Sequence, residues 1–338
     1  MARPKLLPDN FTLCLIATVV TASLLPCHGQ VATGFNWLTN LAIGLLFFLH
    51  GAKLSREAVV AGATHWRLHL LVLASTFAMF PLLGLALKPL LSPLVTPGLY
   101  AGVLFLCTLP STVQSSIAFT SMAKGNVPAA VCSASASSLI GIFITPLLAG
   151  LVISTHAAGG FSLHTIWSIV LQLLVPFVAG QLLRPFIGNW VDRNKGILRY
   201  VDQSSILLVV YTAFSEAVNE GLWHTIPLSA LAGLVVVCAV LLAIALMLTA
   251  LAAKRCGFDM ADQITIVFCG SKKSLASGIP MAKVMFAGHA VGAVVLPLML
   301  FHQIQLMTCA VLAQRWGARD LTAERQAAAR AATTGRTP

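Results

Sequence analysis

Two adjacent lysines, Lys272 and Lys273, lie in the stretch FCGSKKSLASGIP (268–280), within a long run of apolar residues. An ionised side chain inside a membrane is costly and usually marks a functional site. Gly270, Ser271 and Ser274 flank the pair, and residues of these types favour an interrupted helix over a continuous one. We therefore predict a functional break in a helix here, with carbonyl groups exposed on one side and N–H groups on the other.

Another stretch, LPSTVQSS (109–116), has the same character. Pro110 removes a backbone N–H and clashes with the preceding turn. Gln114, Ser115 and Ser116 follow it and offer polar side chains to the freed backbone. Helix carbonyl ends attract cations and helix N–H ends attract anions, so two such breaks predict a polar binding site near the membrane midplane. The alternative is a proline kink and an unrelated polar packing patch.

The composition indicates a membrane protein that crosses the bilayer several times. Of 338 residues, 58% are hydrophobic and 9% are charged, whereas soluble domains have about 25% charged residues. The net charge of +11 would suggest nucleic acid in a soluble protein, but here it indicates cytoplasmic loops. Eight scattered cysteines form no CxxC pair, and no acid–base, nucleophile or metal motif appears. We expect no enzyme, no cofactor, no metal site and no nucleic-acid partner.

The apolar stretches predict an all-α protein with ten transmembrane helices in one domain, residues 1–312. The stretches are 11–27, 34–51, 67–88, 98–122, 127–153, 164–184, 202–220, 227–253, 262–286 and 288–312. Corresponding stretches in the two halves (about 11–153 and 164–312) are offset by a similar distance, and Gly270 follows Pro110 by 160 residues. Each half has five predicted membrane-crossing helices. Because five is an odd number, the C-terminal half must be inverted relative to the N-terminal half. Inverted repeats with interrupted helices in corresponding places are typical of secondary transporters.

The basic residues predict the orientation. With the N-terminus inside, seventeen of the 21 Lys and Arg fall in cytoplasmic segments, as the positive-inside rule requires. Both termini are then cytoplasmic, and residues 313–338 form a basic tail. The compact, Ala- and Leu-rich chain favours a bacterial inner membrane.

These motifs resemble the bile acid:sodium symporter family over essentially the whole chain. The local matches are "LPSTVQSS...AKGNVP" (109–128) and "FCGSKKSLASGIPMA" (268–282), and the match at 268–282 resembles the SBF-like branch, which includes bacterial homologues and the seventh vertebrate member. The resemblance implies that the broken fourth and ninth helices cross. It also implies sodium coupling. However, Phe268 occupies the position at which the sodium-coupled members have a glutamate. Lys272 and Lys273 occupy the positions of a Gln-Asn pair in those members. Ser115 and Ser116 resemble a Ser-Asn pair of the same members.

Three roles remain open for the lysines. One ammonium could replace the sodium ion as a tethered cation, the pair could bind an anionic substrate, or a buried lysine could carry protons during transport. Glu216 is the acidic residue nearest to mid-membrane and is our candidate counter-ion for a lysine of the pair.

The predicted function is therefore a secondary transporter that moves a small organic solute, expected to be an anion, by alternating access. Coupling to sodium or protons is open, and so is the oligomeric state. The alternative is a membrane regulator of ion homeostasis that uses the same scaffold without transporting.

Overall fold

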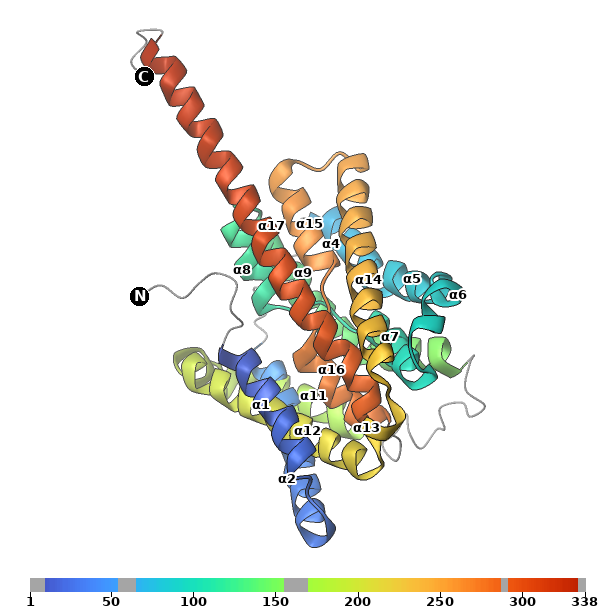
Figure 1. Cartoon of the computed structure of the whole chain (residues 1–338). Helices are drawn as coiled ribbons and strands as arrows, with labels where there is room; N and C mark the ends of the chain where they lie inside the picture. The colour runs from blue at the N-terminus through green and yellow to red at the C-terminus, as the bar shows by residue number, and fades with distance from the viewer. Residues whose placement is uncertain (1–9, 54–64, 155–169, 287–290, 334–338) are drawn as a thin grey trace.

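The computed structural model describes residues 10–53, 65–154, 170–286 and 291–333, and these residues form helices and no strand. Figure 1 shows the helices gathered in one bundle from which the C-terminal helix extends. The segments of the N-terminal half are α1 (Asn10–Leu24), α2 (Gly29–Lys53), α4 (Trp66–Ala74), η2 (Ser75–Met79), α5 (Phe80–Ala86), α6 (Lys88–Leu91), η3 (Ser92–Leu94), α7 (Pro97–Thr108), α8 (Gln114–Met122) and α9 (Val127–Ser154). Those of the C-terminal half are η4 (Val170–Leu174), α11 (Val175–Arg193), α12 (Lys195–Asn219), α13 (Leu222–Thr225), α14 (Leu228–Arg255), α15 (Met260–Gly270), α16 (Leu275–Met285) and α17 (Val291–Thr333).

Six of these helices are long and apolar enough to cross a membrane. They are Gly29–Lys53, Trp66–Ala86, Val127–Ile153, Leu171–Arg193, Leu228–Arg255 and Val291–Ala318. The other predicted spans correspond to the short α1, the more polar α12 and two interrupted pairs, α7 with α8 and α15 with α16. The predicted span 164–184 begins outside the described residues. The count of ten spans therefore stays a prediction, while the described residues form an all-helical architecture with several helices apolar enough to cross a membrane.

Four helices, α1, α2, α11 and α12, pack mainly on one another and lie together below the rest in Figure 1. Glycines let α2 and α11 approach closely, because a Cβ atom at Gly51 would lie 2.0 Å from the carbonyl oxygen of Phe177. The remaining helices form another group around α7, α8, α15 and α16. α12 joins the two groups through its contacts with α16 and α17.

The helix α17 continues beyond the predicted membrane boundary. It runs without interruption from Val291 to Thr333, so the predicted tail 313–338 begins inside a helix. The division at residue 312 has no counterpart in the secondary structure and stays a prediction.

Candidate functional site

The first break separates α7 from α8 where the sequence predicts it. α7 ends at Thr108, and Leu109 is extended (φ −72°, ψ 154°) because the ring of Pro110 excludes a helical residue before it. α8 begins at Gln114. Behind the break, a Cβ atom at Gly141 of α9 would lie 2.6 Å from the Cβ of Pro110. A glycine is therefore needed there for α9 to pack against the proline.

The second break separates α15 from α16. α15 ends at Gly270, and the Ser271 hydroxyl donates to the Val267 carbonyl at 2.6 Å. Ser274 is extended and its hydroxyl accepts the N–H of Ser277 at 3.2 Å, which caps the first turn of α16. Gly270, Ser271 and Ser274 therefore shape the ends of the two half-helices, as predicted.

The two breaks satisfy each other's exposed backbone groups. Ser111 and Ser116, from the first break, donate hydroxyl hydrogen bonds to the carbonyls of Cys269 and Phe268. In return, the N–H of Ser274 donates to the Pro110 carbonyl at 2.9 Å. Groups that would each cost free energy if buried without a partner are thus paired across the two halves of the chain.

The ammonium of Lys273 lies in a cage of backbone oxygens. Its Nζ donates to the carbonyls of Thr76, Cys107 and Leu109, each at 2.8 Å. It also lies 4.2 Å from the centre of the Phe80 ring. A lysine ammonium has three N–H donors, and here all three are used. The side chain is fully buried, so this cation is held by the protein and not by water.

One of these carbonyls is free because of a local irregularity. The helix from Trp66 to Ala86 contains a π-helical turn, η2, in which the N–H of Phe80 bonds to the carbonyl of Ser75. The next residue, Pro81, has no N–H and cannot bond to Thr76 in the same way. The Thr76 carbonyl therefore points to Lys273 without losing a helical hydrogen bond. π-helical turns of this kind are frequent at functional sites.

Lys272 has a different environment, although it is equally buried. Its Nζ donates to the Ser115 carbonyl at 3.0 Å, which is its one carbonyl acceptor among the described residues. It lies 3.8 Å from the centre of the Phe119 ring and 5.5 Å from that of Phe268. Cation–π contacts stabilise an ammonium without using its N–H donors fully. Lys272 therefore retains donor capacity for a further ligand, whereas Lys273 does not.

Sequence reasoning missed a glutamine that holds the lysine pair in place. Gln305 of α17 is fully buried, its Oε1 accepts the N–H of Lys273 at 3.0 Å, and its Nε2 donates to the Lys273 carbonyl at 2.9 Å. These two hydrogen bonds hold the backbone of Lys273, on both sides of its Cα atom, between the half-helices. Two glutamines, Gln303 and Gln305, inside the apolar stretch 288–312 were the signal that could have revealed it. Ser137 of α9, which accepts the N–H of Ser111 at 3.0 Å, was visible only as one of several serines.

Most predicted site residues meet at the two breaks, and two do not. Ser115 and Ser116 share hydrogen bonds with Thr112, but Gln114 begins α8 with an exposed side chain. Glu216 does not face Lys272 or Lys273. Its carboxylate pairs with Lys283 at the other end of α16, which corrects the expected counter-ion.

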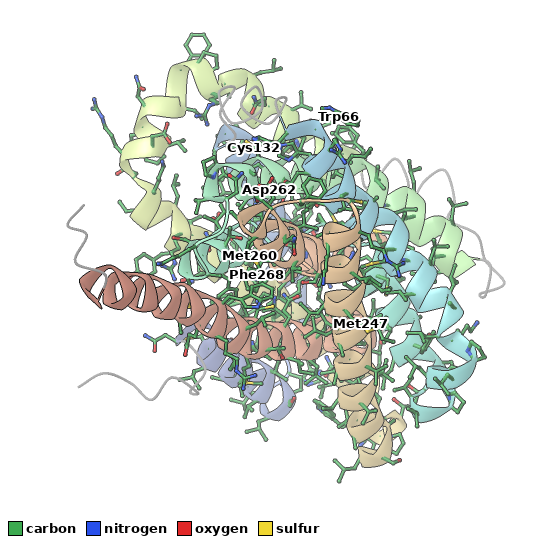
Figure 2. All side chains as sticks on the ribbon, turned by 90° about the horizontal axis from the view of Figure 1, so that it is seen from above. Trp66, Cys132, Met247, Met260, Asp262 and Phe268 are labelled. Carbon is green, nitrogen blue, oxygen red and sulfur yellow. The ribbon has the colours of Figure 1, made fainter. Side chains whose placement is uncertain are left out.

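The reason for this correction is distance along the chain. Lys283 lies ten residues after Lys273, and α16 begins between them at Leu275, so about 12 Å of helix lies between its start and Lys283. One carboxylate cannot serve both. In the view from above, Phe268 and Asp262 lie on α15, beside α14 (Figure 2).

Comparison with known proteins gives a consistent result. A family model described as the SBF-like CPA transporter family matches residues 9–318. The chain is 70% identical to the "Uncharacterized protein PA2026" of Pseudomonas aeruginosa, over 94% of this chain and 96% of that protein. It is 60% identical to YfeH of Escherichia coli K12, which carries the name of a symporter, over 91% and 92% of the two chains. It is 30% identical to rat sodium/bile acid cotransporter 7, over 81% and 82%.

Proposed function

This chain belongs to the SBF-like CPA transporter family, and from this premise we propose that it moves a small organic anion across the membrane by alternating access. The family and the relatives support a secondary transporter of the symporter type, with a small-molecule substrate. They favour a transporter over an enzyme. The finer parts of the proposal are the substrate charge, the coupling and the moving parts. They rest on the lysine pair and on the helix contacts around it.

The proposed scaffold has ten membrane-crossing segments in two inverted halves within one domain. The interruptions at 109–113 and 271–274 support it, because they occur in corresponding segments and bond to each other. Both termini are cytoplasmic in this proposal, residues 313–338 form the cytoplasmic tail, and the membrane is a bacterial inner membrane. The distribution of Lys and Arg supports this orientation.

Lys273 is proposed to act as a permanent cation. Three carbonyl oxygens surround its Nζ at equal distances, which is the type of oxygen cage that also suits an alkali cation. An ammonium in the cage repels a second cation at short range, and the repulsion is strong where the dielectric constant is low. We therefore expect that sodium does not drive transport in this protein.

Lys272 is proposed to bind the substrate anion, and its spare donor capacity is the observation that carries this assignment. Its ammonium is next to the N-terminal turn of α8, whose free N–H groups also favour negative charge. The hydroxyls of Thr112 and Ser115, 2.8 Å apart, lie at the start of this turn. A carboxylate is the simplest group that fits such a set of donors.

Alternating access requires the two helix groups to move relative to each other. Glu216 of α12 and Lys283 of α16 form the one ion pair between these groups among the described residues, whereas Lys53 with Asp202 and Arg184 with Asp192 pair within one group. We propose that the Glu216–Lys283 pair closes one side of the transporter in this conformation and must open during the cycle.

The proposal is tested by a ligand screen on the purified protein. Thermal stability is measured with a panel of organic anions, cations and neutral solutes, at several pH values and with sodium replaced by choline. We expect an organic anion to raise the melting temperature of the wild type equally in sodium and in choline, and to have no effect on Lys272→Met. Stabilisation that requires sodium, or that Lys272→Met retains, would contradict the assignment. Stabilisation that depends on pH in the wild type alone would instead favour a proton-carrying role for Lys272.

A further inference from the structure

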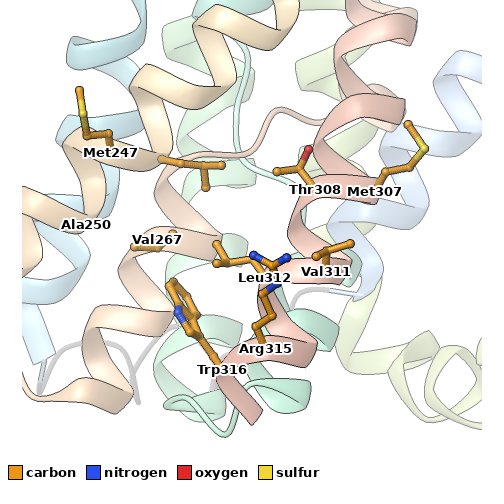
Figure 3. A pocket seen from close by; sticks show the side chains of 10 residues that line it. Met247, Ala250, Val267, Met307, Thr308, Val311, Leu312, Arg315 and Trp316 are labelled. Atoms are coloured by element: carbon orange, nitrogen blue, oxygen red, sulfur yellow. The ribbon is translucent and has the colours of Figure 1, made fainter. Parts of the chain in front are cut away.

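A groove outside the lysine site opens on the outer surface of the helix bundle, where apolar side chains such as Met247 and Met307 are exposed. It has a volume of about 670 Å³, within the range of about 300–1,000 Å³ that is usual for small-molecule sites. Its walls are α14 and α17 and its floor is α15 (Figure 3). The lining residues are Leu246, Met247, Ala250, Val267, Met307, Thr308, Val311, Leu312, Arg315 and Trp316.

The groove is apolar along its length and basic at one end. Met247 and Met307 lie at one end in Figure 3, and their side chains are 60% and 50% exposed. Arg315 and Trp316 lie at the other end. Open apolar surface on a helix pair within a bilayer contacts lipid chains, and tryptophan and basic residues are typical of the level of the lipid headgroups.

More positive charge gathers toward the same end. Figure 3 shows that α14, from Met247 to Ala250, runs in the same direction as α17, from Met307 to Arg315. Lys254 and Arg255 end α14, and both side chains are exposed. The basic end of the groove thus has charge from two helices, which complements an anionic headgroup and not a zwitterionic one.

We propose that this groove binds one acyl chain of an anionic phospholipid, with the lipid phosphate held by Arg315. The apolar length of the groove takes the chain, and the guanidinium pairs with the phosphate in a bidentate manner. The lipid is a bound ligand of this protein, separate from the transported solute.

The ring of Phe268 connects this groove to the lysine pair. The Trp316 ring packs against the Phe268 ring with centroids 5.2 Å apart, and the Phe268 centroid lies 5.5 Å from the Nζ of Lys272. A lipid that fixes Trp316 therefore also fixes a wall of the Lys272 environment. The binding proposal itself does not depend on the proposed function, since lipid binding is measured without transport.

Native mass spectrometry of the full-length protein in detergent tests the proposal. The probes are phosphatidylglycerol and phosphatidylcholine with the same palmitoyl and oleoyl chains, titrated in parallel. We expect phosphatidylglycerol to bind about fivefold or more tightly than phosphatidylcholine, and Arg315→Gln to remove that preference. Arg193→Gln, at the end of α11, removes one positive charge elsewhere and is the matched control. It is expected to keep the preference for phosphatidylglycerol.

Another pair of variants tests the apolar part. Ala250→Trp places an indole inside the groove and is expected to reduce binding of both lipids. Leu251→Trp, one residue further along α14 and outside the lining, is expected to leave binding unchanged. Equal binding of the two lipids by the wild type, an unchanged preference in Arg315→Gln, or a second copy of the chain bound instead of lipid would each overturn the proposal.

Discussion

The carbonyl oxygen of Thr76 accepts a hydrogen bond from the Nζ of Lys273 at 2.8 Å, across 197 residues of sequence. The carbonyl is available because a π-helical turn and Pro81 leave it without a helical donor. The lysine is available because its own helix is interrupted after Gly270. Two irregularities in different helices, each unfavourable alone, are thus paired with each other.

Removing this ammonium should destabilise the fold. Lys273→Ala leaves three buried carbonyls without a donor, and each such group costs about 1–3 kcal/mol. We expect a loss of at least about 3 kcal/mol in the free energy of unfolding, seen as a large fall in the melting temperature in detergent. Lys254→Ala, at an exposed end of α14, is the control and should change little. A melting temperature for Lys273→Ala within a few degrees of the wild type would disprove the caging role.

The same variant should respond to sodium. If Lys273 occupies a cation cage, its removal leaves oxygen ligands that an alkali cation can use. We expect the melting temperature of Lys273→Ala to rise with sodium chloride and not with choline chloride, and the wild type to show no difference between these salts. An identical response of the variant to both salts would argue against the cage as a cation site.

Lys272 should behave in the opposite way. Replacing a buried charge with an apolar residue of similar size is often neutral or stabilising, and Lys272 has one carbonyl partner where Lys273 has three. Lys272→Met should therefore keep its stability within about 1 kcal/mol, while transport in proteoliposomes is lost. Lys272→Arg should retain part of the activity, because the positive charge remains. A Met variant that transports normally would exclude the proposed role.

The Glu216–Lys283 pair should control opening on its side of the protein. The side chains of Glu216 and Lys283 are 33% and 11% exposed. Breaking an exposed pair costs about 0.2–1 kcal/mol of folding free energy, and breaking a buried pair costs about 3–5 kcal/mol. We expect a value between these two ranges. We expect Glu216→Gln and Lys283→Gln each to speed amide hydrogen exchange in α16. The exchanged pair, Glu216→Lys with Lys283→Glu, should restore the slow exchange. Equally fast exchange in the double variant would mean that the pair does not act as a closure.

Two glycines offer a matched test of packing behind the first break. Gly141→Ala puts a methyl group 2.6 Å from Pro110 and should destabilise the protein by about 1–3 kcal/mol. Gly34→Ala, in the interior of α2 with no atom within 4 Å of the new methyl group, should stabilise it by up to about 1 kcal/mol. Thermal unfolding in detergent measures both, and changes of the same sign would contradict this account of Pro110.

The two interruptions could be predicted from the sequence because proline and glycine act on the backbone directly. Pro110 forces Leu109 out of the helix, and Gly270 ends α15, whatever the neighbours are. Long apolar stretches likewise predict helices in a membrane, because a helix satisfies its backbone hydrogen bonds within one segment. The serines around each break were predictable for the same local reason.

The partners of the lysines could not be predicted, because backbone carbonyls do most of the binding. Any residue type can offer a carbonyl, so Thr76 and Cys107 have no signal in the sequence. The backbone of Lys273 is held by Gln305 from another helix, a contact that the sequence does not reveal. Glu216 was paired with the wrong lysine because the sequence does not show at which level along α16 the helix α12 contacts it.

The three-carbonyl cage around Lys273 also has a consequence for energy conversion. A cation attached by covalent bonds has a local concentration that no change in the surrounding salt can alter. If the Lys273 ammonium stays in the cage throughout the transport cycle, as proposed, the cage cannot take up an ion on one side of the membrane and release it on the other. On this proposal, the energy for net uphill movement enters with the solute, through the membrane potential acting on its charge, or through a proton that travels with it.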